Sequence, residues 1–100
     1  EVLQVGDLRL EVARHEVHLG QTKLELTSLE FDLLHVLMAH ADRVLTREQL
    51  LNQVWGYDYY GDTRTVDTAV KRLRAKLRRL APDQECIVTV RGVGYKLQEP

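Results

Sequence analysis

The sequence predicts an α+β fold in which short strands come first, three helices follow and a β-hairpin closes the domain. Three observations carry this prediction: period-two alternation of apolar residues over the first 26 residues, 3.6-residue periodicity between residues 27 and 80, and two β-rich runs around a Gly-x-Gly near the end. With 100 residues, 44% of them hydrophobic, the chain has the size of one domain and enough apolar residues for a core. We therefore expect one domain over residues 1–100.

Short alternating segments predict an antiparallel sheet at the N-terminal end. They cover residues 8–12, 16–19 and 23–26, and turn-forming residues such as Gly6-Asp7 and Gly20-Gln21 separate them. Strands this short, with a polar residue at every second position, are typical of a meander that packs one face on a core and leaves the other in water.

Two capping boxes mark the starts of the first two helices. Thr27 to Glu30 precedes a segment that runs to about residue 41, with Leu29 on its broad apolar face. Thr46 to Gln49 opens a shorter helix that Gly56 is placed to end. Between the two helices, residues 43–45 are expected to form a short extended bridge.

The third helix is expected to start near Thr63 and to end before Pro82. Its spacing predicts an inward stripe made of Val66, Ala69, Val70, Leu73, Leu77 and Leu80. The far side carries Arg64, Thr68, Lys71, Arg72, Ala75 and Arg79, flanked by Arg74 and Arg78. Asp67 precedes Lys71 by one turn, and the two are expected to pair.

A loop and a hairpin complete the pattern. Residues 56–62 hold two glycines, two aspartates and three tyrosines, which suits a turn-rich surface segment. At least one tyrosine is expected to pack on the core, and the others offer a contact surface. Residues 87–90 and 95–97 are the expected hairpin strands, with Gly92 and Gly94 supplying positive φ at its tip.

The charges are distributed unevenly along the chain, although the net charge is only −1. Residues 1–62 carry 5 basic and 11 acidic side chains, whereas residues 63–100 carry 9 basic and 4 acidic ones. A positive potential confined to one element attracts a polyanion even on a near-neutral domain. A basic helix that only keeps the domain in solution explains the same numbers, so charge alone leaves both interpretations open.

Several classes of protein are excluded or disfavoured by composition. A single cysteine, Cys86, rules out an intrachain disulfide, and we expect it to pack near the start of a strand. No run of 18 apolar residues and no leader pattern is present, which favours a cytoplasmic protein. Without a phosphate loop, a nucleophile–base pair or a metal set, we expect no enzyme, no cofactor and no metal. The histidines without ligand spacing, expected at the surface, are His15, His18, His35 and His40.

The outer face of the third helix suits double-stranded DNA. A helix fits the major groove, which is about 12 Å wide, when donors alternate with small residues on its outer face. The hairpin would be a wing whose tip residue, Arg91, enters the narrow minor groove. The rival is a protein-interaction module that uses the acidic first half and the tyrosine loop.

Four segments in order then closely resemble one family. Residues 26–34, 43–56, 64–77 and 89–97 are similar to the winged-helix DNA-binding domain of OmpR/PhoB-class two-component response regulators, and the resemblance spans residues 3–97. It implies a winged helix-turn-helix with an N-terminal four-stranded antiparallel sheet, a three-helix core and a C-terminal hairpin wing. It also implies sequence-specific DNA binding and transcription regulation, with the third helix in the major groove and the wing in the minor groove.

The resemblance also implies roles for individual residues. Arg72 would reach into the major groove, and the positions that would touch phosphates or bases are Arg64, Thr68, Lys71 and Arg74. The wing and strand positions would be Thr89, Arg91 and Tyr95, and Arg79 joins the DNA-facing set from its place on the outer face. The loop from Trp55 to Asp62, including Gly56, Tyr57 and Asp58, would contact RNA polymerase. Ala69 departs from the family, since many members carry a phosphate-contacting His there.

Some of these residues also have a purely structural alternative role. Trp55 is expected in the core before the interface, and Tyr95 in wing packing alone is an alternative to a DNA contact. Arg47 either pairs locally or meets phosphate, and Asp67 is expected to orient Lys71 or Arg74. As partners, the resemblance implies direct DNA repeats, RNA polymerase, a receiver domain that this chain lacks, and that receiver's sensor kinase. The isolated domain is expected to be a monomer.

Overall fold

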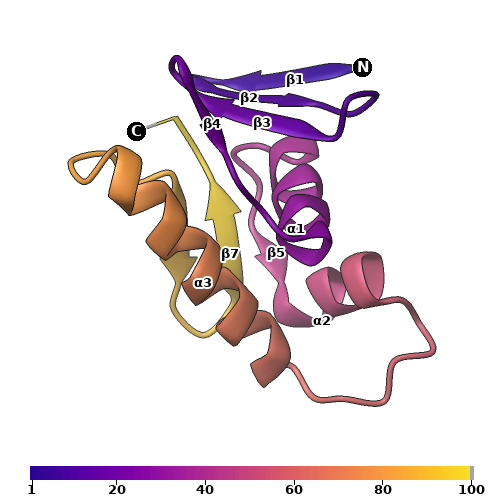
Figure 1. The fold of residues 1–100 in the computed structure, drawn as a ribbon. Coiled ribbons are helices and arrows are strands. Elements are labelled where there is room, and N and C mark those ends of the chain that lie inside the picture. The colour runs from indigo at the N-terminus through magenta and orange to yellow at the C-terminus, as the bar shows by residue number, and fades with distance from the viewer. Residues whose placement is uncertain (100) are drawn as a thin grey trace.

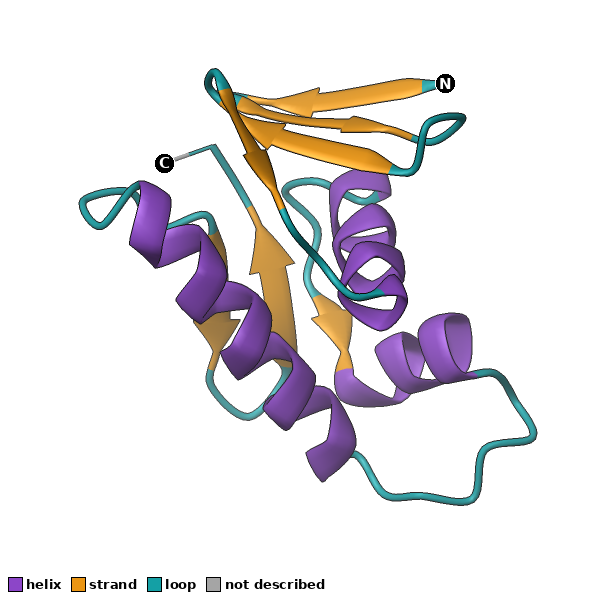
Figure 2. Ribbon diagram, viewed as in Figure 1, coloured by secondary structure: helices purple, strands orange, loops and turns teal. Residues whose placement is uncertain are grey.

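The structure, a computed structural model, describes residues 1–99 and places two antiparallel sheets around a helical core (Figure 1, Figure 2). The elements are β1 (Val2–Val5), β2 (Leu8–Glu11), β3 (Glu16–Leu19), β4 (Thr22–Leu24), α1 (Ser28–Ala39), β5 (Leu45–Thr46), α2 (Arg47–Leu50), η1 (Leu51–Trp55), α3 (Arg64–Leu80), β6 (Ile87–Val90) and β7 (Gly94–Leu97). The α+β prediction, with its four-stranded sheet, helical core and hairpin, is confirmed.

The N-terminal sheet is a meander in the order β1-β2-β3-β4, lying across one end of α1 in Figure 1. Alternate side chains of β2 and β3 are buried, among them Leu10, which lies opposite Val17 in the register. Alternation within the chain had not indicated β1, because its apolar residues Val2 and Leu3 are adjacent. Its pairing with β2 makes it a strand.

The capping box of α1 is confirmed, but it orients two side chains differently from the prediction. Thr27 Oγ1 accepts from the Glu30 backbone N–H at 3.1 Å, and Glu30 Oε1 accepts from the Thr27 N–H at 2.9 Å. Glu30 is thereby buried, 2.6 Å from the ammonium of Lys76 on α3. Leu29, expected on the buried face, is 38% exposed because the first turn gives its inward position to Glu30.

The second helix starts as predicted and then widens. Its Thr46–Gln49 capping box is present, and Thr46 is also the last residue of β5. Only four residues are α-helical, since η1 is a π-helical turn in which the Gly56 N–H bonds to the Leu51 carbonyl at 3.2 Å. Gly56, at φ 100°, ends the segment as expected.

The second sheet has the order β5-β7-β6, with β6 and β7 forming the hairpin. Gly92 has φ 77° at the tip, as predicted. Gly94 does not have positive φ, so that part of the prediction was wrong; it is required because a Cβ there would collide with the carbonyl oxygen of Leu45 on β5. Cys86, directly before β6, is buried as expected.

Helix α3 packs its predicted stripe inward with one exception. Val66, Ala69, Val70, Leu73 and Leu77 are buried. Leu80 is 42% exposed, because it is the last residue of the helix and extends beyond the core. Within residues 1–99, no helix combines the length and apolar character that crossing a membrane needs.

Candidate nucleic-acid interface

The outer face of α3 presents the side chains that the sequence assigned to it. Those exposed along it are Arg64, Thr68, Lys71, Arg72, Ala75 and Arg79. Thr68 and Ala75 are short, so the longer basic side chains between them are not crowded by neighbours. The face therefore has the donors and the slim centre that a helix needs in a major groove.

Arg64, at the N-terminal end of this face, is partly neutralised by the loop before it. Its guanidinium bonds to Asp62 Oδ2 at 2.7 and 3.0 Å, and Asp62 Oδ1 accepts from its backbone N–H at 2.8 Å. The Arg64 side chain stays 87% exposed, and the hydrogen bonds from Arg64 lower the pKa of Asp62. Arg64 can thus reach a phosphate, but its guanidinium must then either bond to both the phosphate and Asp62 or release Asp62.

The wing lies alongside α3 (Figure 1). Arg74 Nη2 on the helix donates to Thr89 Oγ1 on β6 at 2.9 Å, while Arg91 is exposed in the turn between β6 and β7. The Nε of Arg74 is buried and has no partner among the described residues. Arg74 therefore joins helix and wing in addition to being a candidate for contact with DNA.

Tyr95 and Asp67 do not have the surroundings that were expected. Tyr95 is buried at 5% exposure, and its hydroxyl donates to Asp67 Oδ1. The same oxygen accepts from Arg47 Nε at 2.7 Å. The predicted pairing of Asp67 with Lys71 was therefore wrong. The Tyr95 ring is buried, as in the alternative by which this residue serves to pack the wing. Arg47 pairs across 20 residues rather than locally.

The pKa values in this cluster follow from its contacts. Burial raises the pKa of Asp67, but the hydrogen bonds from Tyr95 and Arg47 outweigh it and leave the pKa lowered. For Tyr95, burial and then the bond to Asp67 raise the pKa of the phenol. At neutral pH the cluster therefore holds a carboxylate between a neutral phenol and a guanidinium.

The loop from Trp55 to Asp62 contains one aromatic pair in contact, Trp55 and Tyr59, and two tyrosines that are exposed to solvent. Trp55 is half-buried, its ring centroid 6.3 Å from that of Tyr59, and the Tyr59 hydroxyl lies 3.2 Å from Thr65 Oγ1. Tyr57 is 84% exposed and Tyr60 fully exposed. Tyr59 therefore contacts Trp55 but stays 39% exposed, so the expectation that a loop tyrosine packs on the core was wrong, and the other two leave a contact surface.

Ala69 lies where α1, η1 and α3 meet. With Leu29, Trp55 and Arg72 it lines a cavity of about 250 Å³. A larger side chain at this position would fill part of that space. The methyl group of Ala69 is buried and carries no hydrogen-bond donor.

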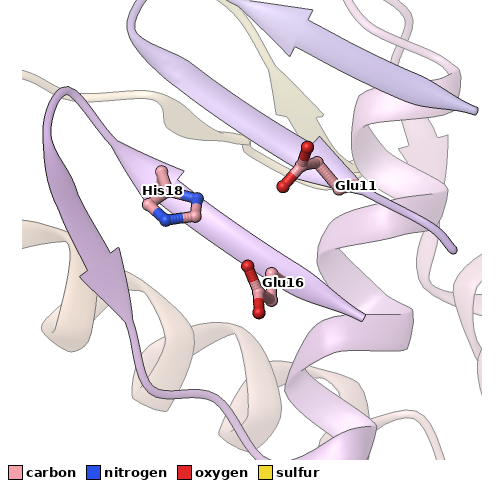
Figure 3. Close-up of side chains that lie close together, drawn as sticks. All are labelled: Glu11, Glu16 and His18. Atoms are coloured by element: carbon pink, nitrogen blue, oxygen red, sulfur yellow. The ribbon is translucent and has the colours of Figure 1, made fainter. Parts of the chain in front are cut away.

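A second cluster of titratable groups lies on the outer face of the N-terminal sheet. Figure 3 shows Glu11, Glu16 and His18 facing one another, with one ligand atom of each within 4.8 Å of the others. Arg9 is 3.2 Å from the Glu11 carboxylate and Lys23 is 3.8 Å from that of Glu16. Since these cations already neutralise both carboxylates, the cluster is explained as a charge-paired sheet surface.

The histidines were expected at the surface, and only one of them is fully there. His15 is exposed and stacks on Phe31 at 3.8 Å between ring centroids. His18, His35 and His40 are half-buried. The register of β2 and β3 brings His18 to two carboxylates, an approach that spacing along the chain did not reveal.

An exposed basic helix, a hairpin beside it and a short-stranded N-terminal sheet define a winged-helix domain of the DNA-binding class. Residues 20–97 match the family Transcriptional regulatory protein, C terminal. The chain belongs to this family, as the OmpR/PhoB resemblance predicted.

Relatives and solved structures agree with this assignment. The chain is 50% identical over 97 residues to the sensory transduction protein RegX3 of Mycobacterium leprae, covering 97% of this chain and 49% of RegX3. It is 46% identical over 96 residues to the alkaline phosphatase synthesis transcriptional regulatory protein PhoP of Bacillus subtilis, covering 96% and 40%. The chain thus spans half or less of these relatives.

Among solved structures, the fold matches the Klebsiella pneumoniae RstA DNA-binding domain in complex with the RstA box. That match has a TM-score of 0.87 and 34% identity, and covers 100% of this chain and 99% of the other. The DNA-binding domain of CpxR from E. coli matches with a TM-score of 0.84 and 32% identity over 100% and 99%. The winged-helix fold is therefore confirmed.

Proposed function

We propose that this chain binds double-stranded DNA sequence-specifically, with α3 in the major groove and the β6–β7 wing in the minor groove. The observation that carries the proposal is the row of exposed basic side chains on α3, tied by Arg74 and Thr89 to a wing with Arg91 at its tip. A similar domain, RstA of Klebsiella pneumoniae, was solved in complex with its DNA box, which supports the same role here.

Salt dependence tests this proposal. Each phosphate that the protein neutralises contributes about −0.9 to the slope of log affinity against log salt, so four contacts give a slope of roughly −4. A duplex titration at several salt concentrations should give a slope of this order. A flat response would favour the rival protein-interaction module built on the acidic half and the tyrosine loop.

We further propose that residues 1–100 are the output domain of a cytoplasmic two-component response regulator and act without enzymatic activity. Its partners would be a receiver domain in the same protein, that receiver's sensor kinase and RNA polymerase. The identity to RegX3 and PhoP, which are about twice the length of this chain or longer, supports this arrangement. Joining the chain to a receiver and measuring DNA affinity before and after phosphorylation is the test; an unchanged affinity would contradict it.

A further inference from the structure

Helix α3 is tied to the wing at two positions, Asp67 and Arg74. The Tyr95 hydroxyl donates to Asp67, and Arg74 donates to Thr89 at 2.9 Å. Tyr95 and Thr89 are directly opposite each other in the register of β7 and β6. Because seven residues make about two helical turns, both ties leave the same face of the helix. Together they fix the rotation of α3 against the wing.

A third element joins at the same carboxylate oxygen. Arg47, the first residue of α2, donates its Nε to Asp67 Oδ1 at 2.7 Å. Its guanidinium also lies 5.3 Å from the ring centroid of Tyr95, and that of Arg74 lies 5.9 Å away. Both guanidinium groups therefore lie within cation–π range of the buried ring. We call Arg47, Asp67 and Tyr95 the Asp67 bridge.

The Asp67 carboxylate of the bridge lies next to the face of α3 that is proposed to meet DNA. Between Asp67 and Arg74 lie Thr68, Lys71 and Arg72, the exposed side chains proposed to meet DNA. The Asp67 side chain is itself 40% exposed, so a negative charge stands beside the surface that would meet phosphates. On Coulomb grounds alone this carboxylate weakens binding to every duplex.

We propose that Asp67 is a positioning residue, which through Tyr95 and Arg47 sets α3 against the wing so that both reach their grooves on one duplex. The inference rests on the proposed DNA binding and adds a residue that contacts no base. The Asp67 carboxylate lowers non-specific affinity through its charge, and the geometry of the bridge confers sequence discrimination. Loss of the bridge therefore lowers discrimination.

The neutral variant Asp67→Asn separates geometry from charge. If the charge alone mattered, the variant would bind every duplex more tightly. The positioning role predicts weaker binding to the preferred duplex and equal or tighter binding to a shuffled one. Asn keeps the shape of the side chain but offers Arg47 and Tyr95 a weaker, uncharged acceptor, so the ratio of the two affinities should fall severalfold.

Two further variants keep the result interpretable. Tyr95→Phe removes one bond of the bridge without changing any charge, and it should lower the ratio in the same direction. Glu85→Gln is the matched control, because Glu85 also pairs with an arginine of α3, Arg78, at 2.7 Å. Its contact with Arg78 does not involve the wing ties, so the variant removes one negative charge and should leave the ratio unchanged.

The experiment begins by selecting a preferred duplex from a random-sequence library with the wild-type chain. Affinities for that duplex and for a shuffled duplex of equal composition are then measured at one salt concentration for all four proteins, with thermal melts beside them. A ratio that falls for Asp67→Asn and Tyr95→Phe but not for Glu85→Gln supports the inference. An unchanged ratio in both bridge variants, or an equal loss on both duplexes, overturns it. A wild-type chain that selects no sequence overturns the proposed function as well.

Discussion

At the scale of single residues, Arg72 and Lys71 are neighbours with different expected effects on DNA binding. Arg72 is exposed near the centre of the α3 face, where a guanidinium reaches base edges, so Arg72→Ala should cost about 1–3 kcal/mol on a selected duplex and flatten sequence preference. Lys71→Ala should weaken selected and shuffled duplexes alike. Competition binding with both duplexes checks this, and equal losses from Arg72→Ala would contradict base reading.

The buried pair of Glu30 and Lys76 carries a prediction about stability. Burial alone would raise the pKa of Glu30, but the hydrogen bonds from Lys76 and from the Thr27 backbone lower it below its ordinary value of 4.5. A carboxyl whose pKa is lowered on folding stabilises the fold above its unfolded pKa, and this stability is lost as pH falls through the folded pKa.

Lys76→Met should therefore lower the free energy of unfolding by about 2–3 kcal/mol near neutral pH, because a buried carboxylate loses its partner. The deficit should shrink as pH falls through the lowered pKa of Glu30, because its carboxylate then becomes protonated. Urea unfolding across this pH range is the measurement. Lys23→Met is the control, since its pair with Glu16 is a surface pair that should contribute little. A deficit that does not change with pH would assign the role of Lys76 to its hydrogen bond with the Glu25 carbonyl, at 3.1 Å.

Contacts between near neighbours in the sequence are predictable, whereas contacts between distant residues are not. The capping boxes of Thr27 and Thr46 act within three residues, so the sequence contains all that defines them. The partners of Asp67 lie 20 and 28 residues away, and nothing near Asp67 in the chain indicates them. Lys71, one turn along the helix, is the partner that local spacing predicts. Packing of α2 and β7 against α3 instead brings Arg47 and Tyr95 to Asp67.

At the scale of elements, the loop between η1 and α3 is expected to act in transcription rather than in DNA affinity. Its residues Tyr57 and Asp58 are exposed, whereas Tyr59 anchors the loop at Trp55. Changing Tyr57 and Asp58 together to Ala should leave duplex affinity nearly intact and lower activated transcription in a reconstituted assay. Loss of DNA binding with the fold intact would place the loop in the DNA interface.

Elements also differ in how far the sequence defines them. Strands β2 to β4 of the meander, α1, α3 and the hairpin follow from periodicity and turn residues, and these predictions are confirmed. The π turn of η1 and the close approach at Gly94 depend on how the hairpin meets β5 and how the helices pack. The exposed face of α3 was predictable, because a helical period divides inward from outward residues. The Asp67 bridge needed the tertiary structure.

At the scale of the whole molecule, we expect the isolated domain to be a monomer, and two copies to bind head-to-tail on direct repeats. Residues 1–62 carry an excess of acidic side chains and residues 63–100 an excess of basic ones, which suits a heterologous contact between neighbours. Two α3 helices on one face of the duplex require half-sites about 10–11 bp apart.

Inserting about five base pairs between the repeats turns the second half-site to the opposite face, so cooperative occupancy should drop sharply. Gel-shift titrations on the two spacings measure this. Cooperativity that ignores spacing, or that prefers an inverted repeat, would contradict the head-to-tail arrangement.

In the proposed complex, α3 occupies the major groove while the wing occupies the adjacent minor groove. Dimethyl sulfate footprinting tests it in one measurement, because the reagent methylates guanine N7 in the major groove and adenine N3 in the minor groove. The wild-type chain should protect guanines within the half-site and adenines beside it. Arg72→Ala should lose the guanine protection and Arg91→Ala the adenine protection. Protection in neither groove, or the same loss from both variants, would contradict this placement of α3 and the wing.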